Sequence, residues 1–321
     1  SFLPEYYQRA AELLSDVLFN STFPKKEIEK EKDVVIDEIN SYKDEPQEEI
    51  YDEFEEMLFK GHSLAHNILG TRETVKIFNK KNISDFINRN YINTSIVICS
   101  VGNINFEKLV NIINKYYSMY NNNNDVSKRL PFNIDNTFNT IIEKKISHTH
   151  LLMGCTAYGS DDDRRIPLML LDNLLGGPAM NSRLSLQIRE KYGFSYNIGS
   201  NYNAFSDCGV FNIYASCDDG NMSKTIDLIY LELKKLREKK LGTLQLSRAK
   251  KQLTGQIAIS FESDLNEMLS IGKSYIVFNK VDDLLTVFEK INSVNSNDIL
   301  EIANDLLLPE KLSMLIYKPQ T

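Results

Sequence analysis

The sequence predicts an α+β protein built from two homologous domains, each with helices packed against an antiparallel sheet. Three observations support this prediction. Stretches with helical periodicity alternate with strand-like stretches along the 321 residues. A pattern of helix, turn and strand in the first half returns in the second half. A polar, turn-rich segment at 121–131 (NNNNDVSKRLP) separates the two halves and is typical of an exposed linker.

The repeat is clearest when residues 78–98 are set over residues 294–314, an offset of 216. Apolar residues then coincide at six positions, and Asn79 falls over Asn295. Each copy is predicted to form a short amphipathic helix, a turn and an alternating strand. The helices predicted further upstream also match in pairs, 5–20 with 222–240 and 27–45 with 247–265.

The linker divides a predicted N-terminal domain, residues 1–120, from a C-terminal homologous domain, residues 132–321. The second domain opens with the strand-like stretch IIEKKISHTHLLMG. Projecting its start back by the offset gives 132 − 216 = −84. If the halves match in length, we expect the first copy to be truncated by roughly 80–90 residues at its front.

Composition excludes several classes of function. Lys and Arg total 37 against 44 Asp and Glu, and a net charge of −7 argues against a nucleic-acid or anionic-lipid binder. The 42% hydrophobic content suffices for a buried core. No apolar run approaches the roughly 20 residues of a membrane span. Four cysteines without a CxxC pair favour free thiols in a reducing compartment such as the cytoplasm, although the N-terminus itself leaves localisation open.

Residues 27–44 (EIEKEKDVVIDEINSYKD) predict a helix with an unusual distribution of charge. At about 100° per residue, Glu38 falls inside the apolar arc, and Glu31 shares that face. An inward carboxylate is costly unless it is paired, hydrogen-bonded or bound to a metal. The segment is thus either part of a metal site or a partly exposed stripe with ion pairs to a neighbouring helix. Spacing alone favours the stripe and does not choose between Glu31 and Glu38.

The histidines offer no convincing metal site from their spacing. One pair has the i, i+4 spacing of a helical zinc site, but flanking glycines indicate a loop there. The other pair alternates on a predicted strand and is typical of core or edge histidines. In chain order these residues are His62, His66, His148 and His150.

Two further segments contain candidate site residues. The Gly176-Gly177-Pro178 turn lacks the Lys-Ser/Thr ending of a phosphate loop, which argues against nucleotide binding. Arg189 and Tyr196 stand seven residues apart at a predicted helix-to-strand transition. Taken alone, they are typical of an exposed arginine at a helix end and a core tyrosine.

The chain resembles the insulinase/pitrilysin-type zinc metallopeptidases, the family that includes the mitochondrial processing peptidases. In the first half the resemblance lies in EIEKEKDVVIDEINSYKDEP, FKGHSLAHNILGTRETV and IVICSVGNINFEKLVNIINKYY. In the second half it lies in NLLGGPAMNSRLSLQIREKYGFSYNIGS, and the blocks follow the family's order. The resemblance covers essentially the whole chain and is strongest with short bacterial members built from two homologous domains.

The resemblance implies a role for each candidate. Glu38 matches the third zinc ligand of the family, and Glu31 matches a further carboxylate beside the metal. Tyr196 matches a residue that donates a hydrogen bond to the oxyanion, and Arg189 matches one that anchors the substrate. The bend at Gly176 and Gly177 borders the peptide groove. The implied activity is endopeptidase cleavage of a peptide or protein substrate in a chamber between the halves, with zinc as cofactor.

One part of the family signature is missing from this sequence. The family binds zinc through an HxxEH motif in its first domain, and no such motif occurs in the chain. The motif falls in the block that the repeat places before Ser1, so we expect the chain as given to hold no zinc and to be inactive. The alternative is a non-catalytic peptide-binding or partner subunit of a peptidase complex. By family analogy alone, a homodimer or a heterodimer is expected.

Overall fold

The computed structural model describes residues 1–91, 96–118, 132 and 136–320, so the predicted linker at 121–131 lies outside the described residues. The chain forms two compact units, each assembled from separate stretches. Unit 1 comprises Ser1–Ile39, Gly70–Arg129 and Ile259–Val281, and unit 2 comprises Asn40–Leu69, Leu130–Ala258 and Asp282–Thr321. This grouping differs from the predicted domain boundaries, which remain a prediction.

Unit 2 contains a five-stranded sheet in the order β1-β5-β2-β4-β3. The strands are β1 (Asn139–Lys144), β2 (Thr149–Ala157), β3 (Asn197–Ala204), β4 (Gly209–Cys217) and β5 (Ser313–Pro319). The α+β class is confirmed, and the strand-like stretch at the start of the second copy forms β1 and β2. The sheet is mixed rather than purely antiparallel, because β1 pairs with β5 in parallel, with Ile141 opposite Ile316.

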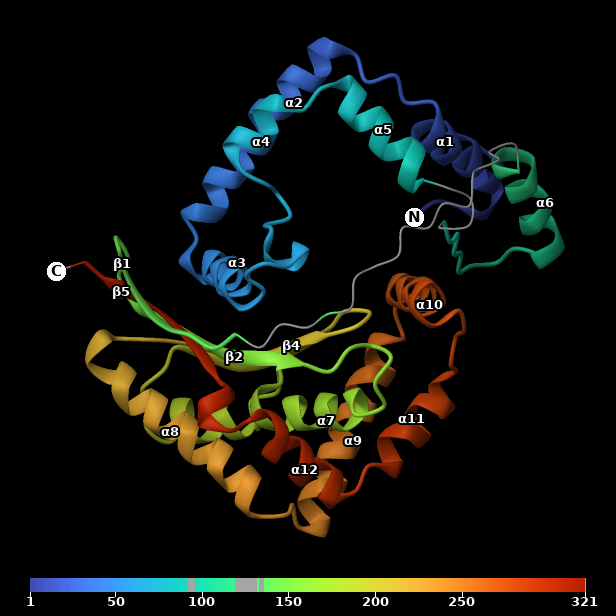
Figure 1. Cartoon of the computed structure of the whole chain (residues 1–321). Helices are drawn as coiled ribbons and strands as arrows, with labels where there is room; N and C mark the ends of the chain where they lie inside the picture. Colours follow the sequence, from blue (N-terminus) through green and yellow to red (C-terminus); the bar gives the residue numbers. More distant parts are fainter. Residues whose placement is uncertain (92–95, 119–131, 133–135, 321) are drawn as a thin grey trace. The chain divides into compact units, whose positions relative to one another are not determined.

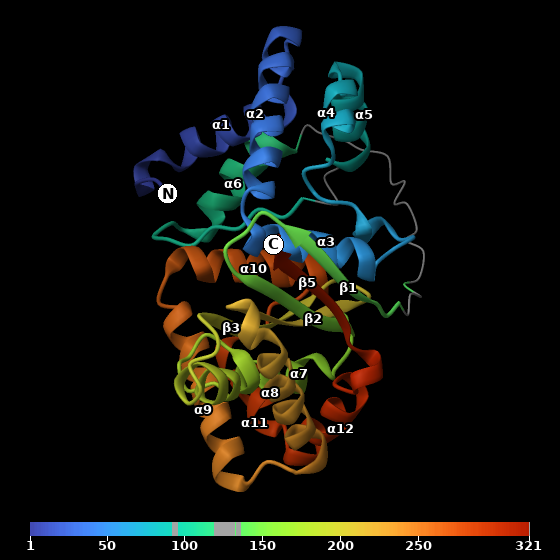
Figure 2. The same cartoon turned by 90° about the vertical axis from the view of Figure 1, so that its left-hand side faces the viewer.

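Helices cover both faces of this sheet. They are α3 (Pro46–Leu58), α7 (Arg165–Gly176), α8 (Asp219–Glu238), α9 (Thr243–Ser260), α11 (Leu284–Ser293) and α12 (Ser296–Leu306). Short helical turns are η2 (Ser63–Ala65), η4 (Ser185–Glu190) and η5 (Pro309–Lys311). The helices α7, α8 and α12 lie on one face and α3 lies on the other (Figures 1 and 2).

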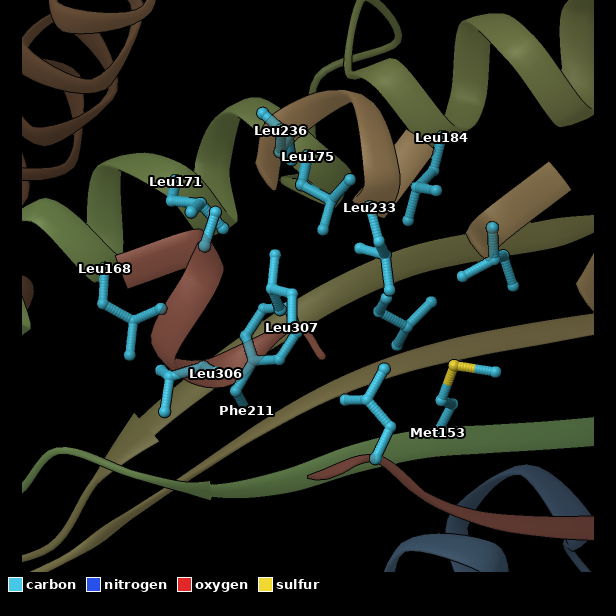
Figure 3. Close-up of a cluster of buried hydrophobic side chains, with 14 of the residues drawn as sticks. Met153, Leu168, Leu171, Leu175, Leu184, Phe211, Leu233, Leu236, Leu306 and Leu307 are labelled. Carbon is cyan, nitrogen blue, oxygen red and sulfur yellow. The ribbon is translucent and has the colours of Figure 1, made fainter. Parts of the chain in front are cut away.

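Successive side chains of β2 point to opposite faces of the sheet, so the core of unit 2 has two layers. Leu151 and Met153 belong to the larger cluster, which includes side chains from α7, α8 and α12. Figure 3 shows Leu171 and Leu175 of α7 in this cluster, together with Phe211 of β4. Leu152 points to the opposite face, where α3 contributes apolar side chains. Because both faces are covered, every residue of β4 is buried.

Unit 1 is helical in the described part of the chain. Its elements are η1 (Pro4–Tyr6), α1 (Tyr7–Phe19), most of α2 (Lys25–Lys43), α4 (Arg72–Ile77), α5 (Lys80–Asn90), α6 (Phe106–Tyr117) and α10 (Asp264–Phe278). The helices α1 and α6 pack together, and the Ser15 hydroxyl donates to the Tyr116 carbonyl at 2.8 Å. An apolar groove remains open beside α1 and α5, with Leu14, Phe86 and Ile98 among its lining residues.

The predicted strand at the end of residues 78–98 does not form in the described residues 96–98. The matching segment of the second copy becomes β5, which hydrogen-bonds to β1 and β2. A strand is stabilised only when its backbone groups pair with a neighbour, and the described part of unit 1 supplies no such strand. The apolar alternation is therefore present in both copies, whereas the structure describes a sheet only in the second.

The helical part of the repeat is confirmed in detail. Asn79 begins α5 and its side chain accepts hydrogen bonds from two backbone amides in the first turn, with a reciprocal contact from the residue three positions on. Asn295 begins α12 with the same capping box. The identical asparagines thus perform the same task 216 residues apart. Among the described residues, no helix has both the length and the apolar character needed to cross a bilayer.

Candidate functional site

Tyr196 lies directly before β3, and its side chain is 61% exposed. Its backbone amide donates to the Ser216 carbonyl at 2.9 Å, which fixes the residue to the end of β4. Its hydroxyl donates to the Asp218 carboxylate, with oxygen–oxygen distances of 3.1 and 3.3 Å. This hydrogen bond raises the pKa of the Tyr196 phenol, because ionisation would place a second negative charge beside the carboxylate. The tyrosine is therefore an exposed, neutral hydroxyl and not a core residue.

His148 completes a small cluster with Tyr196 and Asp218. Its Nδ1 lies 3.5 Å from the Asp218 carboxylate, and its ring centre lies 5.1 Å from that of Tyr196. The expectation that His148 shares a strand face with His150 is wrong, because β2 begins at Thr149 and His148 is exposed in the turn before it. His150 lies inside the strand, and its Nδ1 contacts the Tyr214 hydroxyl at 2.7 Å.

Arg189 lies in the π-helical turn η4 and is exposed, as its position in the sequence indicates. Its Nε lies 3.6 Å from the Glu190 carboxylate, a surface pair of little energetic weight. After η4 the chain reverses at Gly193, whose φ of +63° suits glycine. The reversal leads to β3, so Arg189 and Tyr196 flank one tight connection in unit 2.

The glycine bend at the end of α7 is buried and closely packed. A Cβ on Gly176 would lie 2.2 Å from the Ser200 backbone nitrogen of β3. A Cβ on Gly177 would lie 2.6 Å from the Asn173 carbonyl oxygen. Only glycine allows α7 to approach the strand and turn away this tightly. The bend is thus a rigid corner of unit 2, with no phosphate-binding sequence.

A chain of amide side chains joins this corner to α9. Asn181 donates to Gln252 at 2.9 Å, and Gln252 in turn donates to Asn173 at 3.2 Å. Asn173 then donates to Gln256 at 2.7 Å. Each amide NH2 group donates to the oxygen of the next amide in the series. These hydrogen bonds attach Asn173 and Asn181, which flank the glycine bend, to α9. The scattered asparagines and glutamines carried no spacing signal in the sequence that could have predicted this chain.

Asp172, on α7 beside this corner, was also missed from the sequence. Burial raises the pKa of its carboxyl to about 6. The Ser200 hydroxyl donates to the Asp172 backbone carbonyl at 3.1 Å. One oxygen, Oδ1, is buried without a hydrogen-bond partner in the described part of the chain. An acid within the apolar stretch PLMLLDNLL was the only sequence signal for it.

The carboxylates of α2 do not lie as the apolar arc predicted. Glu31 and Glu38 are both exposed, and Val34, on the same arc, is 56% exposed. Ile39 is the buried residue of this helix. The buried face is therefore turned by about 100°, one residue along the helix, from the direction of Glu38. Within the described residues, Glu38 makes no hydrogen bond or ion pair, so the alternative of pairing with a neighbouring helix is not seen either. It stands free in unit 1.

The described residues do not form a zinc site. They contain no group of three or more His, Cys, Asp or Glu side chains that could hold a metal ion. His62 and His66 flank the short turn η2 instead of sharing a helix, and the His62 ring accepts a hydrogen bond from Leu64. The interpretation of this pair as a loop is confirmed. A zinc ion needs several protein ligands, and one exposed carboxylate does not meet that requirement.

Comparison with known proteins identifies the family. Residues 1–72 match the profile described as insulinase, peptidase family M16, and residues 78–253 match the profile described as peptidase M16 inactive domain. A Rickettsia felis protein named an uncharacterized zinc protease is 30% identical over 98% of the chain and 76% of its own length. A Bacillus subtilis protein, the uncharacterized zinc protease YmxG, is 28% identical over the same shares. The chain belongs to peptidase family M16.

Solved structures agree on the fold. A peptidase M16 inactive domain from Pseudomonas fluorescens has a TM-score of 0.91 at 18% identity, covering 99% of this chain and 76% of that one. A protease from Helicobacter pylori has a TM-score of 0.88 at 17% identity, covering 98% and 77%. A chain of complex III from Candida albicans has a TM-score of 0.86 at 17% identity, covering 98% and 78%. The predicted family and fold class are thus confirmed.

Proposed function

We propose that this chain is the substrate-binding part of a zinc metalloendopeptidase and that, with the residues it has, it binds peptides without cleaving them. The observation that carries the proposal is a mismatch. Relatives named zinc proteases align over 98% of the chain, whereas its described residues contain no metal-ligating group. In this proposal Glu38 is the carboxylate that would contribute to a zinc site, with Glu31 behind it on the same helix.

The substrate contacts in this proposal come from unit 2. The Arg189 guanidinium is exposed and carries five donors, which suit the carbonyl oxygens or a carboxylate of a peptide. The Tyr196 hydroxyl is a neutral polar group that would meet the reacting region of the substrate. Gly176 and Gly177 shape the wall beside β3. The hydrogen bonds through Asn173 fix that wall, so we expect it to bind the peptide as a rigid surface.

Peptide binding is the direct test. We expect a fluorescein-labelled peptide of mixed sequence to bind the 321-residue chain, with anisotropy as the readout. Arg189→Ala and Tyr196→Phe should each weaken binding. Lys240→Ala and Tyr192→Phe are the matched controls, because both residues are exposed and lie outside the proposed contacts. Equal affinities for all five proteins, or no binding by the parent chain, would refute the proposal.

Zinc content and hydrolysis give a second, independent measurement. We expect the purified chain to retain less than stoichiometric zinc after dialysis and to leave a quenched fluorescent peptide intact, with or without added zinc. Stoichiometric zinc that is lost in Glu38→Gln would show that the described residues do form a metal site. Cleavage of the quenched peptide by that zinc-loaded chain would contradict binding without hydrolysis.

A non-catalytic partner subunit is the second candidate function. It is favoured by the profile match of residues 78–253, whose description is an inactive domain of family M16. A partner subunit should associate with a second M16 chain that carries HxxEH and increase its peptidase activity. Size-exclusion chromatography with light scattering on the mixture would show the complex, and a mixture of two unassociated chains would remove this candidate.

A further inference from the structure

Asp218 occupies the N-cap position of α8 but does not cap the helix. A capping aspartate accepts hydrogen bonds from the amides of the first turn, and such a cap typically stabilises by about 1 kcal/mol. The backbone of Asp218 is extended, as at other N-caps, but its side chain makes no capping hydrogen bond. The Asp218 carboxylate therefore does not make the capping hydrogen bond that is available at this position.

The carboxylate instead faces Tyr196 and His148. The Tyr196 hydroxyl donates to it at 3.1 Å, and His148 Nδ1 approaches it at 3.5 Å. The two aromatic rings also contact each other, with centres 5.1 Å apart. One carboxylate thus orients an exposed tyrosine that has no other side-chain hydrogen-bond partner in the described structure.

A phenol has a single proton, and this geometry determines where it points. While the proton is donated to Asp218, the Tyr196 oxygen can offer only lone pairs to an incoming group. Without the Asp218 carboxylate, the Tyr196 proton could be donated elsewhere. The direction of the Tyr196 hydrogen bond therefore depends on Asp218.

We propose that Asp218 is a positioning residue that sets the hydrogen-bond direction of Tyr196, so that the Tyr196 oxygen presents its lone pairs and accepts from a peptide N–H. The substrate-facing part of this inference rests on the proposed function, whereas the coupling between Asp218 and Tyr196 does not.

In the described part of the chain, the titratable neighbours of this cluster include His150, whose pKa is lowered by burial and by the nearby His148. Asp219, the residue after Asp218, accepts from the Thr149 hydroxyl at 2.9 Å and lies 3.8 Å from Lys318. Cys217 is buried at the end of β4, and burial raises the pKa of its thiol. Asp219 therefore has partners of its own, from β2 and β5, and provides a matched control on the same turn.

The test uses the 321-residue chain labelled with carbon-13 at tyrosine Cζ, and Tyr196→Phe assigns the resonance. At pH 7 the Tyr196 signal should shift in Asp218→Ser, which can cap α8 but is too short to hold the phenol. In Asp218→Asn, which also caps well, the phenol should ionise at lower pH than in the parent chain, because the charge is gone. Asp219→Asn should change neither property. An unchanged Tyr196 signal in Asp218→Ser, or an unchanged midpoint in Asp218→Asn, would overturn the positioning role.

Peptide affinity is measured separately on the same variants. A chain that binds no peptide but keeps the NMR coupling would refute the proposed function and leave the Asp218 assignment standing.

Discussion

Asp172→Asn should remove a pH-dependent contribution to the free energy of unfolding of unit 2. The parent carboxyl has a pKa of about 6 in the folded chain, against 3.8 for an ordinary aspartate. Because the folded pKa is raised, the folded state binds the proton more tightly than the unfolded state. The stabilisation from the protonated form is therefore fully present below pH 3.8 and is lost as the pH rises through about 6.

The size of this contribution to the free energy of unfolding follows from the difference between the folded and unfolded pKa of Asp172. A difference of about two pKa units corresponds to about 3 kcal/mol between the extremes of pH, as an order of magnitude. The side chain is mostly buried, and one oxygen has no hydrogen-bond partner in the described residues, so solvent screens it little. At pH 7.5 the ionised carboxylate thus weakens the fold, and Asp172→Asn should be more stable than the parent chain.

The assay is urea unfolding followed by circular dichroism, at several pH values from 4.5 to 7.5, since the chain contains no tryptophan. The quantity of interest is the difference in free energy of unfolding between Asp172→Asn and the parent chain, which should grow in favour of the variant as the pH rises. Asp227→Asn is the control, because Asp227 is exposed on α8. A difference that stays constant across the range would refute the reasoning.

Three further predictions concern the core, the glycine corner and a helix cap. Leu171→Ala opens a cavity in a fully buried cluster and should cost about 2–5 kcal/mol in urea unfolding. Gly176→Ala should destabilise unit 2 and increase amide hydrogen exchange in β3, because its methyl group would collide with the backbone at Ser200. Asn295→Ala removes the capping box of α12 and should cost about 1 kcal/mol, whereas Asn295→Asp should nearly restore the parent free energy of unfolding.

Sequence periodicity predicted the helices of both copies because their apolar faces and caps are local signals. Asn79 and Asn295 illustrate this, since each needs only its own first turn to form the predicted contact. The strand expected at 96–98 was wrong because a strand depends on a neighbour that no local pattern can supply. The parallel pairing of β1 with β5 was missed for a related reason, since it joins residues far apart in the chain.

Among the site residues too, features set by local sequence were predicted and features set by tertiary contacts were not. The exposure of Arg189 followed from its place at the end of a helical turn, but that of Tyr196 did not, because its tertiary partner Asp218 is 22 residues away. Glu38 was assigned an inward face from periodicity, but Ile39, about 100° away on the helix, is the buried residue, and Glu38 is exposed. The apolar stretch around Asp172 was a weak signal, because burial of one side chain is a property of the assembled sheet.

The position of β5 in the sheet has a consequence for how the protein is made. Residues 313–319 lie between β1 and β2, so the strand that is synthesised last of the five is an inner one. Until these residues leave the ribosome, β1 has no partner in the sheet, and β2 exposes an unpaired edge to other chains. The nascent chain must therefore keep its sheet incomplete from the end of β4 at Cys217 until β5 is made, and this interval is when chaperone binding would protect it most.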